Sequence, residues 1–445
     1  MQDTSNSESN DIRSGYLFAP GHEDDPIPCT LYINDHEIKA VIPLLDRLHR
    51  NSYYYRWFSS SNFSYADDPD RELFEYNCPR GVVFADIDGY ISLVDCESTF
   101  AGTNFKFSKG ILKAQYAAIG SKLLDNANYN STRAEIEALD KWLGSAPFIT
   151  KINYTQNKRV ITTTTIDVQE IKILRRLNTT LVQAWNVTTT SDNLQVRYNS
   201  KPYIQTEIKN SENIENHRQI IDNFRKLIAF SSWGMIGYKN VEILNSNDSL
   251  TSLSGESLGD KWCRVKSPHF KPSGRDLERV RFLFNFPDIE SKGIRTWFSL
   301  IEKYPRAFVP LMGSIEAKNN YLENQLILLG ITIESLGRYI SQENNGKRAN
   351  AKGGINFWSC LENVIEEIDP SYPQPKREWM SIIRDTYIAI KHSDNTQPEL
   401  QQIYDSYKWS CAIVALWVCS KIKVDTETIK QNIMLHPKFE NIHFE

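Results

Sequence analysis

The sequence predicts an α+β protein, with a β-rich N-terminal part of antiparallel sheet followed by an all-α bundle. In the first part, short runs rich in Val, Ile, Thr, Tyr and Phe alternate with turn residues, which is typical of antiparallel strands. From Gly293 onward no run has this character. Apolar residues recur there at spacings of three and four, which is the pattern of amphipathic helices.

Size and composition indicate an ordinary globular protein of two or three domains. The chain has 445 residues and a net charge of −4, which excludes a strongly basic coat protein for nucleic acids. Its seven cysteines include no CxxC pair, which argues against a disulfide framework and against a zinc site. We therefore expect free thiols in a reducing compartment, with no metal and no cofactor.

Two further features indicate a cytoplasmic protein with no membrane partner. The first 30 residues are polar and acidic and lack the apolar core of a signal peptide. The longest apolar run, residues 411–419, is too short to span a bilayer.

The β-rich part is expected to span residues 14–290, after a disordered tail at residues 1–13. Asp88-Gly89 lies between two apolar runs and predicts a hairpin. Two later strand pairs are expected to turn at Gln156-Asn157 and near Ser191-Asp192. The other expected elements are strands within 15–43 and 105–123, a loop over 53–70, helices over 132–143 and 214–231, a linker or long loop over 245–260 and a strand over 282–289.

The helical bundle is expected to span residues 291–424, with a C-terminal extension at 425–445. Pro305 is expected to end its first helix, and Pro370, Pro373 and Pro375 separate the third helix from the fourth. The helices are predicted over residues 294–304, 314–341, 356–368, 376–395 and 398–423.

The helix over 376–395 carries candidate functional side chains on the face turned away from its core stripe. Trp379, Ile383, Thr386 and Ile390 form that stripe. At roughly 100° per residue, Ile388 points away from the stripe, and Arg384 and His392 lie about 40° to either side of Ile388.

An Arg and a His on one helix face can cleave RNA without a metal. The imidazole titrates near neutral pH, so it can take the proton of the ribose 2′-hydroxyl or give one to the leaving 5′-oxygen. The guanidinium can hold the scissile phosphate and stabilise the charge that develops on it. The alternative is that both side chains are simply solvated. The chain has no P-loop, GxGxxG, GxSxG or HExxH motif that would indicate another chemistry.

The bundle resembles the HEPN superfamily of helical RNases. The resemblance is carried by residues 323–340 (ENQLILLGITIESLGRYI), residues 377–395 (REWMSIIRDTYIAIKHSDN) and the amphipathic helix that follows. The preceding part is similar to the N-terminal domain of the ApeA family of bacterial anti-phage proteins. That similarity is carried by GYISL at 89–93, TKINYTQNKRVITTTTID at 150–167 and IRTWFSLIEKYPRAF at 294–308.

The resemblance implies that Arg384 and His392 are catalytic and that Asp385 fills the polar position after the arginine. HEPN motifs have four to six residues before the histidine, whereas seven separate this pair, and Asp replaces the commoner Asn. On an ideal helix the two side chains lie roughly 80° apart around the axis and about 12 Å along it. They can therefore converge on one phosphate only if the helix ends or bends near Lys391, or if symmetry mates complete the site.

Several other residues are candidates for a supporting or RNA-binding role. Lys391 could be a second phosphate ligand, and Glu334, which forms an i,i+4 pair with Arg338, could support the site or be a plain surface ion pair. Tyr387 could stack on a base or pack at the edge of the core. Further cations that could contact RNA are Lys347, Arg348 and Lys352.

The resemblance implies a metal-independent endoribonuclease of abortive infection, which cuts host or phage RNA such as tRNA once a phage component triggers it. It also implies a homodimer or larger assembly formed through the bundle, with Ile388 in the contact. The alternative is a non-catalytic protein whose N-terminal domain recognises a phage component and whose bundle only self-associates. A third possibility is a carbohydrate-binding β domain joined to a helical partner module.

Overall fold

A computed structural model of the chain describes residues 11–45, 53–58, 65–104, 107–123, 128–144, 146–155, 158–190, 195–252, 254–317, 321–392 and 394–444. Contacts divide the chain into two compact units. Unit 1 contains residues 1–135, 205–219 and 238–272, and unit 2 contains residues 136–204, 220–237 and 273–445. The predicted fold class is confirmed, since antiparallel sheets occupy the N-terminal part and helices the C-terminal part. The boundary expected near residue 290 separates β-rich from helical sequence, whereas these two units are defined by contacts. That boundary therefore stays a prediction.

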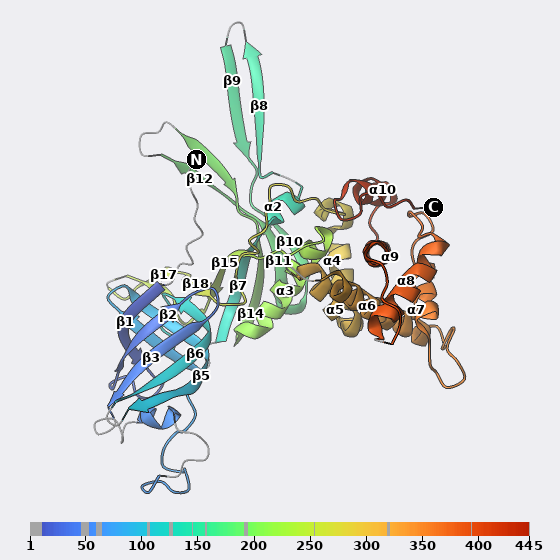
Figure 1. Ribbon diagram of the computed structural model, residues 1–445. Coiled ribbons are helices and arrows are strands. Elements are labelled where there is room, and N and C mark those ends of the chain that lie inside the picture. The colour runs from blue at the N-terminus through green and yellow to red at the C-terminus, as the bar shows by residue number, and fades with distance from the viewer. Residues whose placement is uncertain are drawn as a thin grey trace. The chain divides into compact units, whose positions relative to one another are not determined.

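A closed antiparallel sheet of six strands forms the start of unit 1 (Figure 1, blue to cyan). Its strands follow the order β6-β3-β2-β1-β4-β5, and β5 returns to pair with β6. Alternate residues such as Leu31, Ala40, Phe84 and Leu112 are fully buried and fill its interior. The strands are β1 (Asp11–Phe18), β2 (Ile27–Ile33), β3 (Ile38–Leu45), β4 (Gly81–Asp86), β5 (Gly89–Asn104) and β6 (Phe107–Ile119).

Three predictions for this region can be compared with the structure. The hairpin at Asp88-Gly89 is confirmed, because Asp86 of β4 pairs with Gly89 of β5, and Gly89 has φ +117°, which favours glycine. The predicted tail is too long, because β1 begins at Asp11; residues 1–10 lie outside the described part. The expected loop after Tyr53 begins with a short 3-10 helix, η1 (Tyr53–Phe58).

Further strands continue the sheet of unit 1 in the order β14-β7-β15-β18-β6. They are β7 (Asn128–Ile136), β14 (Tyr203–Asn213), β15 (Tyr238–Leu244) and β18 (Trp262–Lys266). The predicted loop over 245–260 contains only two short strands, β16 (Leu250–Thr251) and β17 (Ser257–Gly259).

The helix predicted over residues 132–143 is wrong for its first half. Residues up to Ile136 belong to β7, and only α2 (Leu139–Trp142) is helical. Ala138, at φ +57°, separates the strand from the short helix. Ile136, Leu139 and Trp142 are all buried. Their helix-like spacing misled the prediction because Ile136 belongs to the strand and the other two to the short helix.

Unit 2 contains two-stranded antiparallel ribbons, β8 (Phe148–Thr155) with β9 (Lys158–Thr165) and β12 (Trp185–Thr189) with β13 (Val196–Ser200) (Figure 1). The strands agree with the sequence prediction, but the expected turns at Gln156-Asn157 and Ser191-Asp192 lie outside the described residues. A third pair is β10 (Gln169–Leu174) with β11 (Thr179–Gln183), joined through η2 (Arg176–Asn178). The predicted helix over 214–231 is confirmed as α3 (Ile214–Ser231).

The C-terminal helices follow the predicted order with two corrections. The strand predicted over 282–289 is wrong: residues 282–285 form no strand and a helix begins at Phe286, where the Asp288 carboxylate accepts the Asn285 backbone N–H at 2.6 Å and Pro287 stands in the first turn. The long helix predicted from residue 314 begins at Leu322, after a separate helix that starts at Pro305. The helices are α4 (Phe286–Lys303), α5 (Pro305–Glu316), α6 (Leu322–Glu343), α7 (Phe357–Glu366), α8 (Arg377–Lys391), α9 (Leu400–Ile422) and α10 (Thr426–Leu435).

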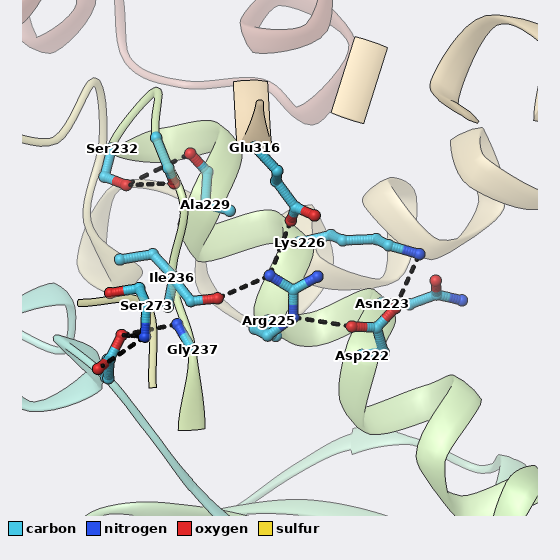
Figure 2. A network of polar contacts seen from close by, with 12 residues as sticks. Asp222, Asn223, Arg225, Lys226, Ala229, Ser232, Ile236, Gly237, Ser273 and Glu316 are labelled. Carbon is cyan, nitrogen blue, oxygen red and sulfur yellow. Dashed lines mark hydrogen bonds and ion pairs between the residues drawn. The ribbon is translucent and has the colours of Figure 1, made fainter. Parts of the chain in front are cut away.

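A buried ionic network in unit 2 ties α3 to α5 (Figure 2). The Arg225 guanidinium donates to Asp222 Oδ1, to the Ile236 carbonyl and to Glu316 Oε1, each at 2.7 Å. Burial opposes ionisation of Asp222, but the charges of Arg225 and Lys226 outweigh it and lower the pKa of that carboxyl to about 2.

Within the described part of the chain, no helix has the length and apolar character needed to cross a membrane.

Candidate functional site

Helix α8 buries the stripe that the sequence predicts. Trp379, Ile383 and Thr386 are buried, while Ile390 is only half-buried. The Trp379 ring stacks on Trp409 of α9, with ring centroids 5.4 Å apart and planes within 4° of parallel. This packing fixes which face of α8 is turned outward, and Ile388 on that face is 37% exposed.

The helix ends earlier than the sequence predicts. It stops at Lys391 rather than at residue 395, and His392 is its C-cap with an extended backbone, φ −119° and ψ 115°. The Asn395 side chain donates to the Ile388 carbonyl at 3.3 Å and so satisfies part of the helix end. The His392 side chain is exposed, and its backbone N–H bonds the Ile388 carbonyl at 3.1 Å, so its Cα keeps the height of a helical residue while its extended backbone redirects the chain that follows.

Arg384 lies on the outward face of α8 between a carboxylate and an aromatic ring. Its Nη2 is 2.6 Å from Asp385 Oδ1, and its guanidinium lies 5.4 Å from the ring centre of Trp358 on α7. The side chains of Arg384 and Asp385 are 38% and 63% exposed. An ion pair this exposed contributes at most about 1 kcal/mol, so a phosphate could displace Asp385 from the guanidinium.

Glu334 on α6 connects that helix to the end of α8. Its carboxylate accepts from Arg338 at 2.8 Å, from Lys391 at 3.4 Å and from the Tyr387 hydroxyl at 3.3 Å. Burial would raise the pKa of Glu334, but the hydrogen bond from Arg338 and the charge of Lys391 outweigh it and lower that pKa. The predicted Glu334–Arg338 pair is therefore present, as part of a larger network.

Tyr387 packs inside the bundle and is only 2% exposed. Its ring lies 4.5 Å from that of Phe357. Gly330 of α6 makes room for it, since a Cβ at that position would come within 2.2 Å of the Tyr387 ring. Of the two interpretations from the sequence, this conformation fits the packed aromatic and leaves no ring face for a base.

Two of the three further cations expected to contact RNA are paired with acids. Lys347 Nζ lies 2.7 Å from Glu366 Oε2, and Arg348 contacts both Glu362 and Glu366. Lys352 is exposed. Hydrogen bonds from Arg348 and Lys347 lower the pKa of Glu366 to about 2, so this acid stays charged beside them. The loop after α6 therefore presents a nearly balanced set of charges.

The structure thus brings together Glu334, Tyr387 and Lys391, and places Arg384 and His392 on the same helix and its cap. Within the described part of the chain, no hydrogen bond or ion pair joins Arg384 to His392. The sequence analysis did not identify Trp358, Gly330 or Asn395 as residues of this site. Gly330 had a signal that could have been used, because a glycine inside a helix often marks close packing. Among the described residues, no three His, Cys, Asp or Glu side chains gather so as to hold a metal ion.

Comparison with known proteins assigns the N-terminal part of the chain. The family model described as ApeA N-terminal domain 1 matches residues 13–297, which is more than half of the chain. The match ends within α4, so α8 lies outside it. No curated protein and no solved structure matches the chain.

Proposed function

This chain belongs to the ApeA family and is an ApeA-type anti-phage defence protein, and from this premise we propose that it acts as a metal-independent endoribonuclease of the HEPN type. On this proposal, a phage component triggers cleavage of host or phage RNA, such as tRNA, in the bacterial cytoplasm. Cleavage then stops growth of the infected cell.

The observation that supports this proposal best is the position at which α8 ends. A continuous helix would hold the Arg384 and His392 side chains about 12 Å apart along the axis, too far for one phosphodiester. His392 is the C-cap of α8, and its extended backbone turns the chain away from the helix axis at this point. Its backbone N–H still bonds the Ile388 carbonyl at 3.1 Å, so the axial separation from Arg384 remains. The end of α8 at Lys391 therefore supports a shared site in which the reach of the Arg384 side chain, or a second copy, closes that separation.

The proposed reaction uses the two side chains in separate roles. The His392 imidazole takes the proton from a ribose 2′-hydroxyl while the 2′-oxygen attacks the adjacent phosphorus. The bond from phosphorus to the 5′-oxygen breaks, and that oxygen leaves with a proton from water or from an imidazolium. Arg384 leaves Asp385 and binds the phosphate oxygens, where charge develops. The products are a 2′,3′-cyclic phosphate and a 5′-hydroxyl.

A supporting role is proposed for Glu334, which holds Lys391 at the end of α8. The side chains of Lys391 and Glu334 are 44% and 24% exposed, so the lysine can contact a phosphate without leaving a deeply buried acid unpaired. Tyr387 positions the same carboxylate through its hydroxyl.

Self-association through α8 would complete the site. Ile388 is exposed between Arg384 and His392, and an apolar residue there gains from contact with a second copy. We propose a homodimer or larger assembly in which the outward faces of two α8 helices meet. Ile388→Glu would place like charges in that contact and is expected to shift the protein toward monomer in sedimentation velocity.

The nuclease proposal is tested during infection, with phages against which the wild type protects. His392→Ala and Arg384→Ala are compared with His443→Ala and Arg377→Ala, which change exposed residues of the same two types in unit 2. We expect the first two variants to lose both protection and RNA fragmentation, and the controls to keep both. If His392→Ala protects as well as the wild type and RNA stays intact in both, the nuclease proposal fails.

The alternative, a non-catalytic recognition protein, also has an observation in its favour. Arg384, Lys347, Arg348 and Lys391 are all paired with carboxylates, as expected of a surface with no anionic ligand. On that account His392→Ala keeps protection, whereas Ile388→Glu loses it. The same infection experiment therefore separates the two proposals.

A further inference from the structure

A second candidate site lies in unit 2, built from residues outside the α8 surface. It is a pocket of about 310 Å³ lined by Trp233, Arg275, Arg279, Arg281, His436, Pro437 and Lys438. Among the described residues that line it, three are arginines, one is a lysine and none is acidic. Cations crowd together at a cost unless an anion neutralises them, so this lining indicates an anionic ligand.

Arg275 is held in place at this pocket by the chain itself. Its Nη1 and Nη2 donate to the hydroxyl and the carbonyl of Ser232, both at 3.1 Å. Gly234 allows this position, since a Cβ there would come within 2.4 Å of Arg275 Nη1. A guanidinium has five N–H donors, so the two bonds to Ser232 leave donors for a ligand. Burial lowers the pKa of Arg275, as expected for a cation that a bound anion would stabilise.

His436 adds a buried imidazole N–H to the lining of the pocket. The side chain is 3% exposed, and its Nδ1 accepts the backbone N–H of Lys438 at 3.1 Å. In the neutral ring the proton is then on Nε2, which makes no hydrogen bond of ordinary geometry among the described residues, although backbone groups of Ser232 and Arg281 lie near the ring. A ligand oxygen in the pocket would give this buried N–H a well-placed acceptor.

The two charged groups that act on the pKa of His436 are both cations. Burial lowers the pKa of His436 to about 4, the nearby cations Arg275 and Lys438 act in the same direction, and the backbone of Ser232 and Arg281 partly opposes them. The Lys438 ammonium lies 4.0 Å from the ring centre of Tyr407. Asp276 approaches Arg279 only at 4.0 Å, and both side chains are more than half exposed.

We propose that this pocket binds a small polyphosphate, either the di- or triphosphate group of a nucleotide or free pyrophosphate. Guanidinium groups match phosphate oxygens with paired hydrogen bonds, and three of them with one ammonium suit an anion of several charges. Ligand pockets range upward from about 300 Å³, so the volume fits a molecule of this size. His436 Nε2–H would donate to a phosphate oxygen.

The pocket joins two parts of the chain that are distant in sequence. Trp233 and the three arginines lie within the matched family domain, whereas His436 and Lys438 follow α10 and lie outside it. A bound polyphosphate would therefore contact the family domain and the C-terminal segment at once. This binding activity is separate from the proposed RNA cleavage and does not depend on it.

The test is calorimetric titration of the full-length protein with pyrophosphate, with ATP and with a single-stranded RNA oligonucleotide. Arg279→Gln and Arg281→Gln change exposed side chains, so the fold should be unaffected, and Arg306→Gln on α5 is the matched control. We expect pyrophosphate or ATP to bind, each pocket variant to weaken binding roughly tenfold or more, and the control to bind as the wild type does. Binding of ATP but not pyrophosphate would identify a nucleotide site. Binding of both would identify a site for the polyphosphate group itself.

The proposal is overturned if neither pyrophosphate nor ATP binds at millimolar concentration, if both pocket variants bind as tightly as the control, or if only the RNA binds. A second measurement follows the His436 imidazole by NMR during a pH titration. Saturation with the ligand should move its titration to higher pH, because the anion stabilises the imidazolium. An unchanged titration in the presence of bound ligand would remove His436 from the site.

Discussion

Substitution of Gly337 by alanine should destabilise the helical bundle, although alanine is the better helix former. Gly337 lies within α6 and faces α7 at very short range. A Cβ there would come within 2.3 Å of Cys360 Cα and 2.5 Å of the Cys360 carbonyl oxygen. Both atoms belong to the backbone of α7, so no side-chain rotation can relieve the clash.

The expected magnitude combines three terms. Forcing α7 away from α6 is overpacking, which typically costs about 1–3 kcal/mol. The shift also weakens the buried bond from Asn363 Nδ2 to the Gly337 carbonyl, 3.1 Å long, for about 1 kcal/mol. The higher helix propensity of alanine stabilises the folded state by about 1 kcal/mol relative to glycine. The net loss in the free energy of unfolding is therefore about 1–3 kcal/mol.

The control is Gly313→Ala on α5, where the nearest atom to a new Cβ is Leu328 Cδ1 at 3.7 Å, an ordinary contact. Gly313 is exposed, so this variant should gain up to about 1 kcal/mol. Thermal unfolding followed by circular dichroism should show Gly337→Ala several degrees below the wild type and Gly313→Ala at or above it. If Gly337→Ala unfolds at the same temperature as Gly313→Ala or higher, the close approach of α6 and α7 is wrong.

Three further predictions concern charged groups. Glu334→Gln should lower the free energy of unfolding by about 1 kcal/mol or less, since the lost pair with Lys391 is partly exposed, and should reduce RNA fragmentation during infection. His436 resists protonation in the folded state down to about pH 4, whereas the unfolded chain binds that proton below about 6.5. Stability should thus be lost as pH falls from 6.5 toward 4, by at most about 3 kcal/mol, and melting curves of His436→Gln should show a shallower pH dependence. Arg225→Ala should lower the free energy of unfolding by about 3 kcal/mol in urea titrations, because Glu316 and its neighbours lose their buried cation; an effect near zero would contradict the network.

Periodicity in the sequence predicted elements well where one face alone is buried. The stripe on α8 and the span of α3 are examples, and the Asp88-Gly89 hairpin was recognised from turn chemistry. The strand predicted over 282–289 was wrong because its apolar residues lead into a helix start, where the Asp288 carboxylate accepts the Asn285 backbone N–H and Pro287 favours the first turn.

The two sites differ in how far the sequence could predict them. Arg384 and His392 share a helix and its cap, so their spacing was visible in one segment. The polyphosphate pocket is assembled from Trp233, the arginines of 275–281 and the turn after α10. These segments meet only through tertiary folding, and none contains a motif, so the sequence alone offered no signal for the pocket.

Arg384 and His392 are proposed to form an RNA-cleaving site. The most direct test maps the ends of RNA fragments from infected cells that express the wild type, His392→Ala or Arg384→Ala at equal abundance. We expect new fragments with 5′-hydroxyl ends in the wild type and none in either variant. The same fragments in His392→Ala cells, or protection by the wild type without any new RNA ends, would contradict it.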